Sequence, residues 1–237
     1  MTTIVGSGGL ALSEQLVLLS YRRDSRVRKA PAMNGAGSMD RAVQAALIIE
    51  LIELGSVTVQ PSPGAIARHT FELRRASRAP TGSATSDALL ADIGSSHHGP
   101  RSLSTWLYSS ALVPRVLGGL VDRGIVSLTT ERVGLLGSAR RVQPVDLQLD
   151  TAVRDHFESV FFDDGEASER DSLLAALIVD GFLADYFAPL RDRAAQLRFL
   201  ARAGQLADVR RPPARSRALG EGDAVTLVLT ALGNTNA

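Results

Sequence analysis

The sequence lacks cysteine, long apolar runs and all but one lysine, and each shortage excludes a class of protein. Without cysteine the chain has no disulfide framework, no Cys-ligated zinc site and no thiol nucleophile. It has no run of about 18 apolar residues, so we expect no membrane-spanning helix. Residues 1–19 have no basic segment ahead of their apolar stretch, which argues against a signal peptide and predicts a cytoplasmic protein.

Sequence signatures of catalysis and cofactor binding are also missing. There is no Gly-x-x-x-x-Gly-Lys-Ser/Thr phosphate loop and no Gly-x-Ser-x-Gly nucleophile motif. The pair His97–His98 fits a polar loop better than a metal site, and the acidic residues at 163–169 lack the spacing of a calcium loop. We therefore expect a non-enzymatic protein with no catalytic residues, no bound metal and no cofactor.

The net charge of +1 conceals an uneven distribution along the chain. Residues 1–145 hold 16 basic and 10 acidic side chains (+6), whereas residues 146–237 hold 10 basic and 15 acidic ones (−5). Such a separation gives a protein a positive and a negative face. We therefore expect anionic partners for the first half and a protein partner for the acidic half. Of the 26 basic residues only Lys29 is lysine, so phosphate contacts fall to arginine, which binds phosphate bidentately.

Apolar periodicity predicts a mainly α fold. The predicted helices span residues 11–20, 40–54, 87–93, 103–112, 114–122, 147–161, 172–183, 191–203 and 223–232. The helix at 40–54, with Asp40 as its cap, is apolar over most of its circumference and should be central. Glu50 lies inside that apolar run. It fits a solvated strip of the helix, and the alternative is a buried partner for an arginine.

Two β-hairpins interrupt the helices. The first joins residues 56–60 to residues 66–75 through a Pro-Gly turn and has an apolar and a basic face. Its candidate membrane-contact residues are Ile66, Arg68, Phe71, Arg74 and Arg75. Basic groups beside exposed apolar side chains suit an anionic bilayer surface. Ordinary solvated charges over a core hairpin are the alternative.

The second, shorter hairpin pairs residues 125–129 with residues 132–136 and is followed by Arg140 and Arg141. With the helix before it, this hairpin also matches a winged helix, whose basic wing contacts the DNA backbone. The helix offers only Arg115 as a donor, whereas DNA-reading helices need more. A winged-helix-type DNA-binding regulator is therefore the alternative function, with nucleic acid as a disfavoured partner.

Several stretches, in a fixed order, resemble the Golgi phosphoprotein 3 family. They are LSEQLVLLSYRRD at 12–24, AALIIELIELGSVTV at 45–59, APTG and DALL within 79–90, RVLGGLVDRGIV at 115–126, and LLAALIVDGFLADYFAPL at 173–190. Its members are peripheral membrane proteins that bind phosphatidylinositol 4-phosphate in eukaryotes and have bacterial relatives. The resemblance implies a flexible segment 1–10 and a single helical domain over 11–234. It also implies that the hairpin at 57–75 projects and mediates self-association.

The resemblance further implies a site for a lipid headgroup. The family's Trp and three Arg positions fall near Gly35, Gln44, Ser110 and Val113, where this chain has other side chains. Arg41 lies one turn before Gln44, and Arg115 lies two residues after Val113. We therefore predict a displaced lipid or anion site formed by Arg22, Arg23, Arg41, Gln44 and Arg115. The expected function is peripheral binding of phosphatidylinositol 4-phosphate or another anionic phospholipid at the inner face of the membrane.

Overall fold

The structure is a computed structural model, and it describes residues 9–21, 36–62, 71–95, 101–108, 112–133, 137–187, 193–210 and 223–236. The helices are α1 (Leu12–Ser20), α2 (Ala36–Glu53), α3 (Ala84–Gly94), α4 (Leu103–Leu107), α5 (Leu112–Asp122), α6 (Leu147–Phe162), α7 (Glu169–Asp180), α8 (Ala184–Phe187), α9 (Arg193–Asp208) and α11 (Ala224–Asn236). Strands β1 (Val57–Pro61) and β2 (Phe71–Arg75) form one antiparallel pair, and β3 (Val126–Val133) and β4 (Gly137–Pro144) form another. The predicted mainly helical fold with two hairpins is confirmed.

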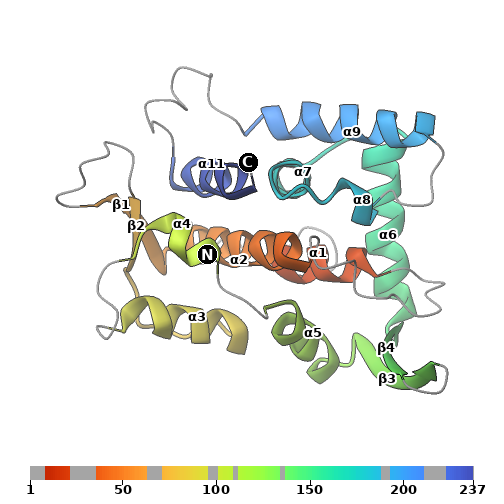
Figure 1. The fold of residues 1–237 in the computed structure, drawn as a ribbon, viewed down its shortest axis with the longest axis horizontal. Helices are drawn as coiled ribbons and strands as arrows, with labels where there is room; N and C mark the ends of the chain where they lie inside the picture. Colours follow the sequence, from red (N-terminus) through yellow and green to blue (C-terminus); the bar gives the residue numbers. More distant parts are fainter. Residues whose placement is uncertain are drawn as a thin grey trace.

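Helix α2 is the central element, as its apolar circumference predicts. Every residue from 42 to 49 is buried, and α1, α4, α5, α7 and α11 pack around the helix. In Figure 1, α7 and α11 lie above α2 with α9 as the outermost layer, and α3 and α5 lie below it. The functional residues on α2 are therefore held by the core and reach the surface only near the ends of this helix.

The outer layer is joined to the rest by aromatic packing. The rings of Phe157 and Phe161 on α6 stack with centroids 4.5 Å apart, and Phe162 stacks on Phe199 of α9 at 5.1 Å. Fully burying such a side chain stabilises the fold by about 1.5–3 kcal/mol. This cluster fixes α9 against α6.

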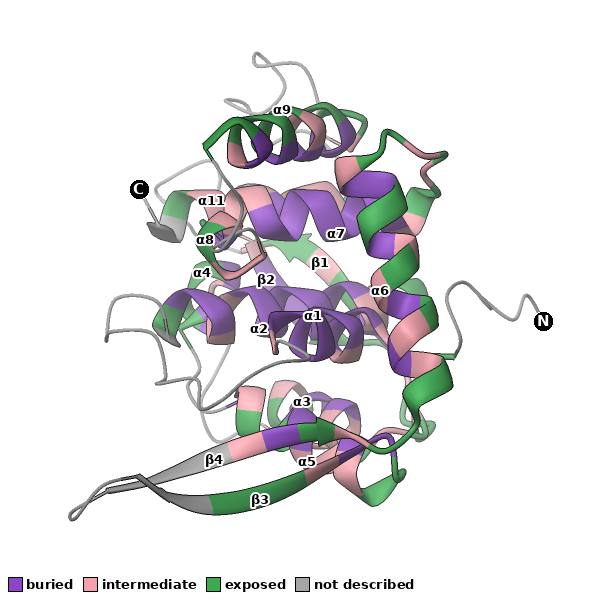
Figure 2. Cartoon of the chain, turned by 90° about the vertical axis from the view of Figure 1, so that its right-hand side faces the viewer, coloured by how far each residue is buried: buried purple, intermediate pink, exposed green. Residues whose placement is uncertain are grey.

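The two hairpins differ in their surroundings. In β1–β2, Val57 and Leu73 are buried, and the strands contact α2, α3 and α4. The turn of the predicted projecting hairpin, residues 63–70, lies outside the described residues. The β3–β4 hairpin extends beyond the helices (Figure 2).

The predicted second strand of β3–β4, residues 132–136, is wrong. Residues 126–133 form one continuous strand, and the return strand is 137–144, with Leu128 opposite Val142. Val126 and Val142 are both buried. Because side chains alternate along a strand, this longer register places both valines toward the core, which the shorter pairing does not.

Several helices begin earlier than predicted because their caps lie further upstream. The Ser83 hydroxyl accepts the N–H of Ser86, so α3 begins at 84 and not at 87. The Ser168 hydroxyl accepts the N–H of Asp171, so α7 begins at 169 and not at 172. Helix α2 begins four residues before Asp40, so Asp40 is not its cap.

Candidate anion-binding site

Asp40 joins the start of α5 to the start of α2. Its Oδ1 accepts the backbone N–H groups of Leu112 and Val113, each at 3.0 Å. First-turn N–H groups have no partner within their own helix, and a carboxylate there also suits the helix dipole. Asp40 therefore caps α5, and the early turns of α5, which carry Arg115, are fixed against those of α2, which carry Arg41.

Arg41 is held at the surface by an aromatic ring. Its guanidinium lies over Tyr108, 5.8 Å from the ring centroid, and its Nη2 donates to the Ser38 hydroxyl at 3.3 Å. Tyr108 follows α4 directly and is 61% exposed. The cation–π contact restrains a planar set of donors whose geometry matches two oxygens of a phosphate.

Gln44 lies behind Arg41. It follows Asp40 by four residues and Arg41 by three, so the three side chains lie along one side of the helix. Gln44 is fully buried, and its Oε1 and Nε2 have no hydrogen-bond partner among the described residues. An unsatisfied buried polar group costs about 1–3 kcal/mol. A polar group that reached this amide would relieve the cost, which makes Gln44 a candidate residue of the site.

The remaining predicted site residues have different placements. Arg115 is exposed on α5. Arg22 and Arg23 lie outside the described residues. The structure therefore brings Arg41 and Gln44 together on one helix and joins to them the turn that carries Arg115.

The hairpin residues are placed only in part. Phe71 is half-buried and packs against the core. The exposed Arg74 donates to buried Glu72 at 2.5 and 2.8 Å, and the exposed Arg75 donates to the Ser77 carbonyl at 2.8 Å. Two further predicted contacts, Ile66 and Arg68, lie outside the described residues.

Glu50 matches neither expectation, the solvated strip or the buried arginine partner. Its Oε1 accepts the Ser13 N–H at 2.7 Å and its Oε2 accepts the Ser13 hydroxyl at 3.3 Å. Burial raises the pKa of Glu50 to about 7, although the hydrogen bonds from Ser13 and the charge of Arg170 oppose the shift. The carboxyl is thus neither solvated nor primarily an arginine partner. It binds the first turn of α1, as Asp40 binds that of α5.

Several arginines of the acidic half have structural partners. Arg154 donates to the Leu18 carbonyl at 3.1 Å, and Arg202 donates to the Val160 carbonyl at 3.1 Å. Both carbonyls lie near the end of a helix, where intrahelical partners are missing. These two side chains hold helix ends together and therefore have a structural role.

Sequence reasoning missed Tyr108. Tyr108 falls inside the predicted helix 103–112, whereas α4 ends at Leu107 and Tyr108 is its C-cap. Its partner Arg41 is far away in the sequence, so only the fold brings them together.

Among the described residues, no group of three or more His, Asp or Glu side chains has the geometry to hold a metal ion. None of the described helices combines the length and the hydropathy needed to cross a bilayer.

Residues 12–222 match the family model described as Golgi phosphoprotein 3 (GPP34). A comparison with curated proteins finds no match. The matched region contains Arg41, Gln44, Tyr108 and Arg115.

Proposed function

The chain belongs to the Golgi phosphoprotein 3 family, and from that premise we propose a non-enzymatic peripheral membrane protein that binds anionic phospholipid headgroups around Arg41. Phosphatidylinositol 4-phosphate is the headgroup that the family suggests. The observation that carries the proposal is the Arg41 guanidinium over the exposed ring of Tyr108, with the unsatisfied amide of Gln44 behind it.

Each residue has a role in this proposal. Arg41 donates two hydrogen bonds to a headgroup phosphate, and Gln44 donates from the inner end of the site. Arg115, with Arg22 and Arg23, adds positive charge at the surface. Each arginine near an anionic bilayer contributes about 1 kcal/mol. Because Asp40 already satisfies the first N–H groups of α5, the side chains must supply the anion's donors.

The proposal extends to the rest of the molecule. The arginines of the first hairpin, with Ile66 and Phe71, add to membrane contact, and this hairpin also mediates self-association. The acidic half faces away from the bilayer toward a protein partner. The site of action is the inner face of the membrane.

Co-sedimentation with vesicles tests the proposal. Vesicles of phosphatidylcholine alone are compared with vesicles that also contain phosphatidylserine or phosphatidylinositol 4-phosphate, at low and high salt. We expect recovery with anionic vesicles only, falling as salt shortens the Debye length from about 10 Å at 0.1 M to about 3 Å at 1 M. Equal recovery with neutral and anionic vesicles would refute it.

Substitution of Arg41 and Arg115 tests the site itself. The double variant Arg41→Ala/Arg115→Ala should lower vesicle affinity about ten- to thirtyfold, at about 1 kcal/mol per arginine, with an unchanged helical circular dichroism spectrum. The matched control is Arg193→Ala/Arg198→Ala, which removes the same charge from exposed positions on α9. Equal losses in both variants would mean that net charge, and not this site, governs binding.

The DNA-binding alternative is tested on the same protein. The structure does contain the helix–hairpin succession of α5, β3 and β4, and Arg141 on β4 is half-buried. A DNA-binding regulator should give saturable, salt-sensitive gel shifts with duplex DNA. A flat titration at low salt removes this alternative.

A further inference from the structure

Phe182 has an unusual backbone conformation. Its φ is 54°, in the left-handed region, and its side chain is 62% exposed. It lies two residues after the end of α7, beyond the C-cap Gly181, where the Leu183 N–H donates to the Ile178 carbonyl and the Phe182 N–H donates to the Val179 carbonyl. Glycine normally occupies this position, because a side chain there is strained. Phe182 therefore has a strained backbone, and burial of its ring in the core does not offset that strain.

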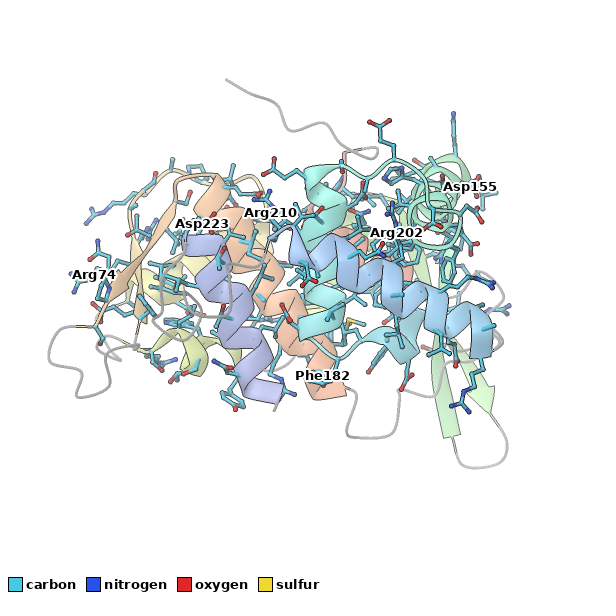
Figure 3. The ribbon with its side chains drawn as sticks, turned by 90° about the horizontal axis from the view of Figure 1, so that it is seen from above. Arg74, Asp155, Phe182, Arg202, Arg210 and Asp223 are labelled. Atoms are coloured by element: carbon cyan, nitrogen blue, oxygen red, sulfur yellow. The ribbon has the colours of Figure 1, made fainter. Side chains whose placement is uncertain are left out.

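Phe182 lies at the same end of α2 as Arg41. A Cβ built on the preceding residue, Gly181, would lie 3.2 Å from the Cβ of Ala42. Ala42 is the residue after Arg41. Figure 3 shows Phe182 at the edge of the molecule toward which β3 and β4 also extend.

Exposed aromatic rings are few in the part of the chain that the structure describes. Among the described residues, the large apolar side chains that are exposed include two aromatic ones, Tyr108 at 61% and Phe182 at 62%. Tyr108 contacts Arg41, and the backbone next to Phe182, at Gly181, packs against Ala42, the residue that follows Arg41. Single exposed apolar residues are common, but an exposed aromatic ring on an arginine and a second one on a neighbouring segment are a composition that suits a lipid–water interface.

We propose that Phe182 inserts into an anionic bilayer, with its ring at the boundary between headgroups and acyl chains while Arg41 binds a phosphate. The inference rests on the proposed function and adds to it a residue that fixes how the molecule lies on the membrane. Insertion supplies the apolar environment that the ring lacks in the free protein. Asp185, three residues further on, is exposed, so the insertion is limited to the ring.

The first experiment replaces Phe182 by glycine. Phe182→Gly should raise the melting temperature, because glycine relieves the strain at φ 54°. It should also weaken binding to phosphatidylserine-containing vesicles about tenfold or more, as expected from losing one buried ring. The control Leu197→Ala, at an apolar residue 59% exposed on α9, should leave binding unchanged. Unchanged binding of Phe182→Gly, or a fall in both melting temperature and binding, would overturn the inference.

The second experiment reports insertion directly. Trp106 is the single tryptophan and is buried, so the wild-type chain gives a low baseline of quenching by brominated acyl chains. Phe182→Trp should add emission that brominated vesicles quench. A variant that binds vesicles without added quenching would overturn the insertion and leave the proposed function intact. If wild-type protein binds no anionic vesicle, both are overturned.

Discussion

Glu50 is a carboxyl whose protonation is linked to folding. Burial raises its pKa in the folded chain from 4.5 to about 7. Between these two values the folded chain holds a proton that the unfolded chain releases. Protonated Glu50 therefore contributes to the free energy of unfolding, fully below pH 4.5, and this contribution is lost as the pH rises through about 7. Burial also raises the pKa of Glu53, which acts in the same direction.

Replacing Glu50 by glutamine should remove most of this dependence. Glutamine keeps an acceptor for the Ser13 N–H but cannot ionise. At pH 8 the Glu50→Gln variant should be more stable than the wild type by up to about 3 kcal/mol, and at pH 4 the difference should nearly vanish. Urea denaturation at both values measures it. A difference that does not change with pH would contradict the raised pKa.

At the residue scale, the sequence identifies unusual side chains but not their partners. Glu50 is conspicuous as a charge within an apolar helix, yet nothing in its neighbourhood indicates Ser13. Arg41 was predicted as a site residue from its place on α2, whereas Tyr108 was not. Such pairs depend on how the helices pack, and local periodicity carries no information about that packing.

At the scale of elements, the helices depend on one another for their caps. Asp40 on α2 satisfies the first turn of α5, and Glu50 on α2 satisfies that of α1. Apolar periodicity therefore predicted which segments are helical, while several of their starting residues were wrong. Helix α8 has only four residues, too few for a periodic signal. The β3–β4 register depends on burial of Val142, which a short alternating pattern does not reveal.

Substitution of Asp40 tests this dependence. Asp40→Ala should destabilise the fold by about 1–2 kcal/mol, because two N–H groups of α5 lose their acceptor. Asp40→Asn keeps an oxygen acceptor and should cost less than half as much. Chemical denaturation of the two variants gives the comparison. Equal losses would show that the charge of Asp40, and not its hydrogen bonds, holds α5.

At the scale of the whole molecule, three labelled side chains mark two ends and one edge of the fold. Arg74 and Asp155 lie at opposite ends of the long axis in Figure 3, with Phe182 at an edge between them. The sequence predicts two oppositely charged halves, but it does not indicate that Phe182 lies exposed at this edge. That exposure depends on the backbone conformation at Phe182, which leaves no pattern in the composition.

The absence of cysteine makes the orientation measurable. Single-cysteine variants at Phe182, Leu197 and Asp155 accept a fluorescent label without competing thiols. On anionic vesicles, the label at Phe182 should be shielded from a water-soluble quencher, while labels at Leu197 and Asp155 should stay accessible. Equal accessibility at all three positions would contradict the proposed membrane-facing edge.

Asp40 and Glu50 of α2 also couple the starts of α1 and α5 to one helix. First-turn amide hydrogens ordinarily exchange with solvent early, since fraying of their own helix is enough to release them. Here the amides of Ser13 and Leu112 are bound by side chains of α2, so we expect a shift of α2 to release both. The hydrogen-exchange rates of these two amides should therefore change together, as in one cooperative unit. If a phosphate bound at Arg41 restrains α2, it should therefore also slow amide exchange at Ser13 in α1, where the ligand makes no contact.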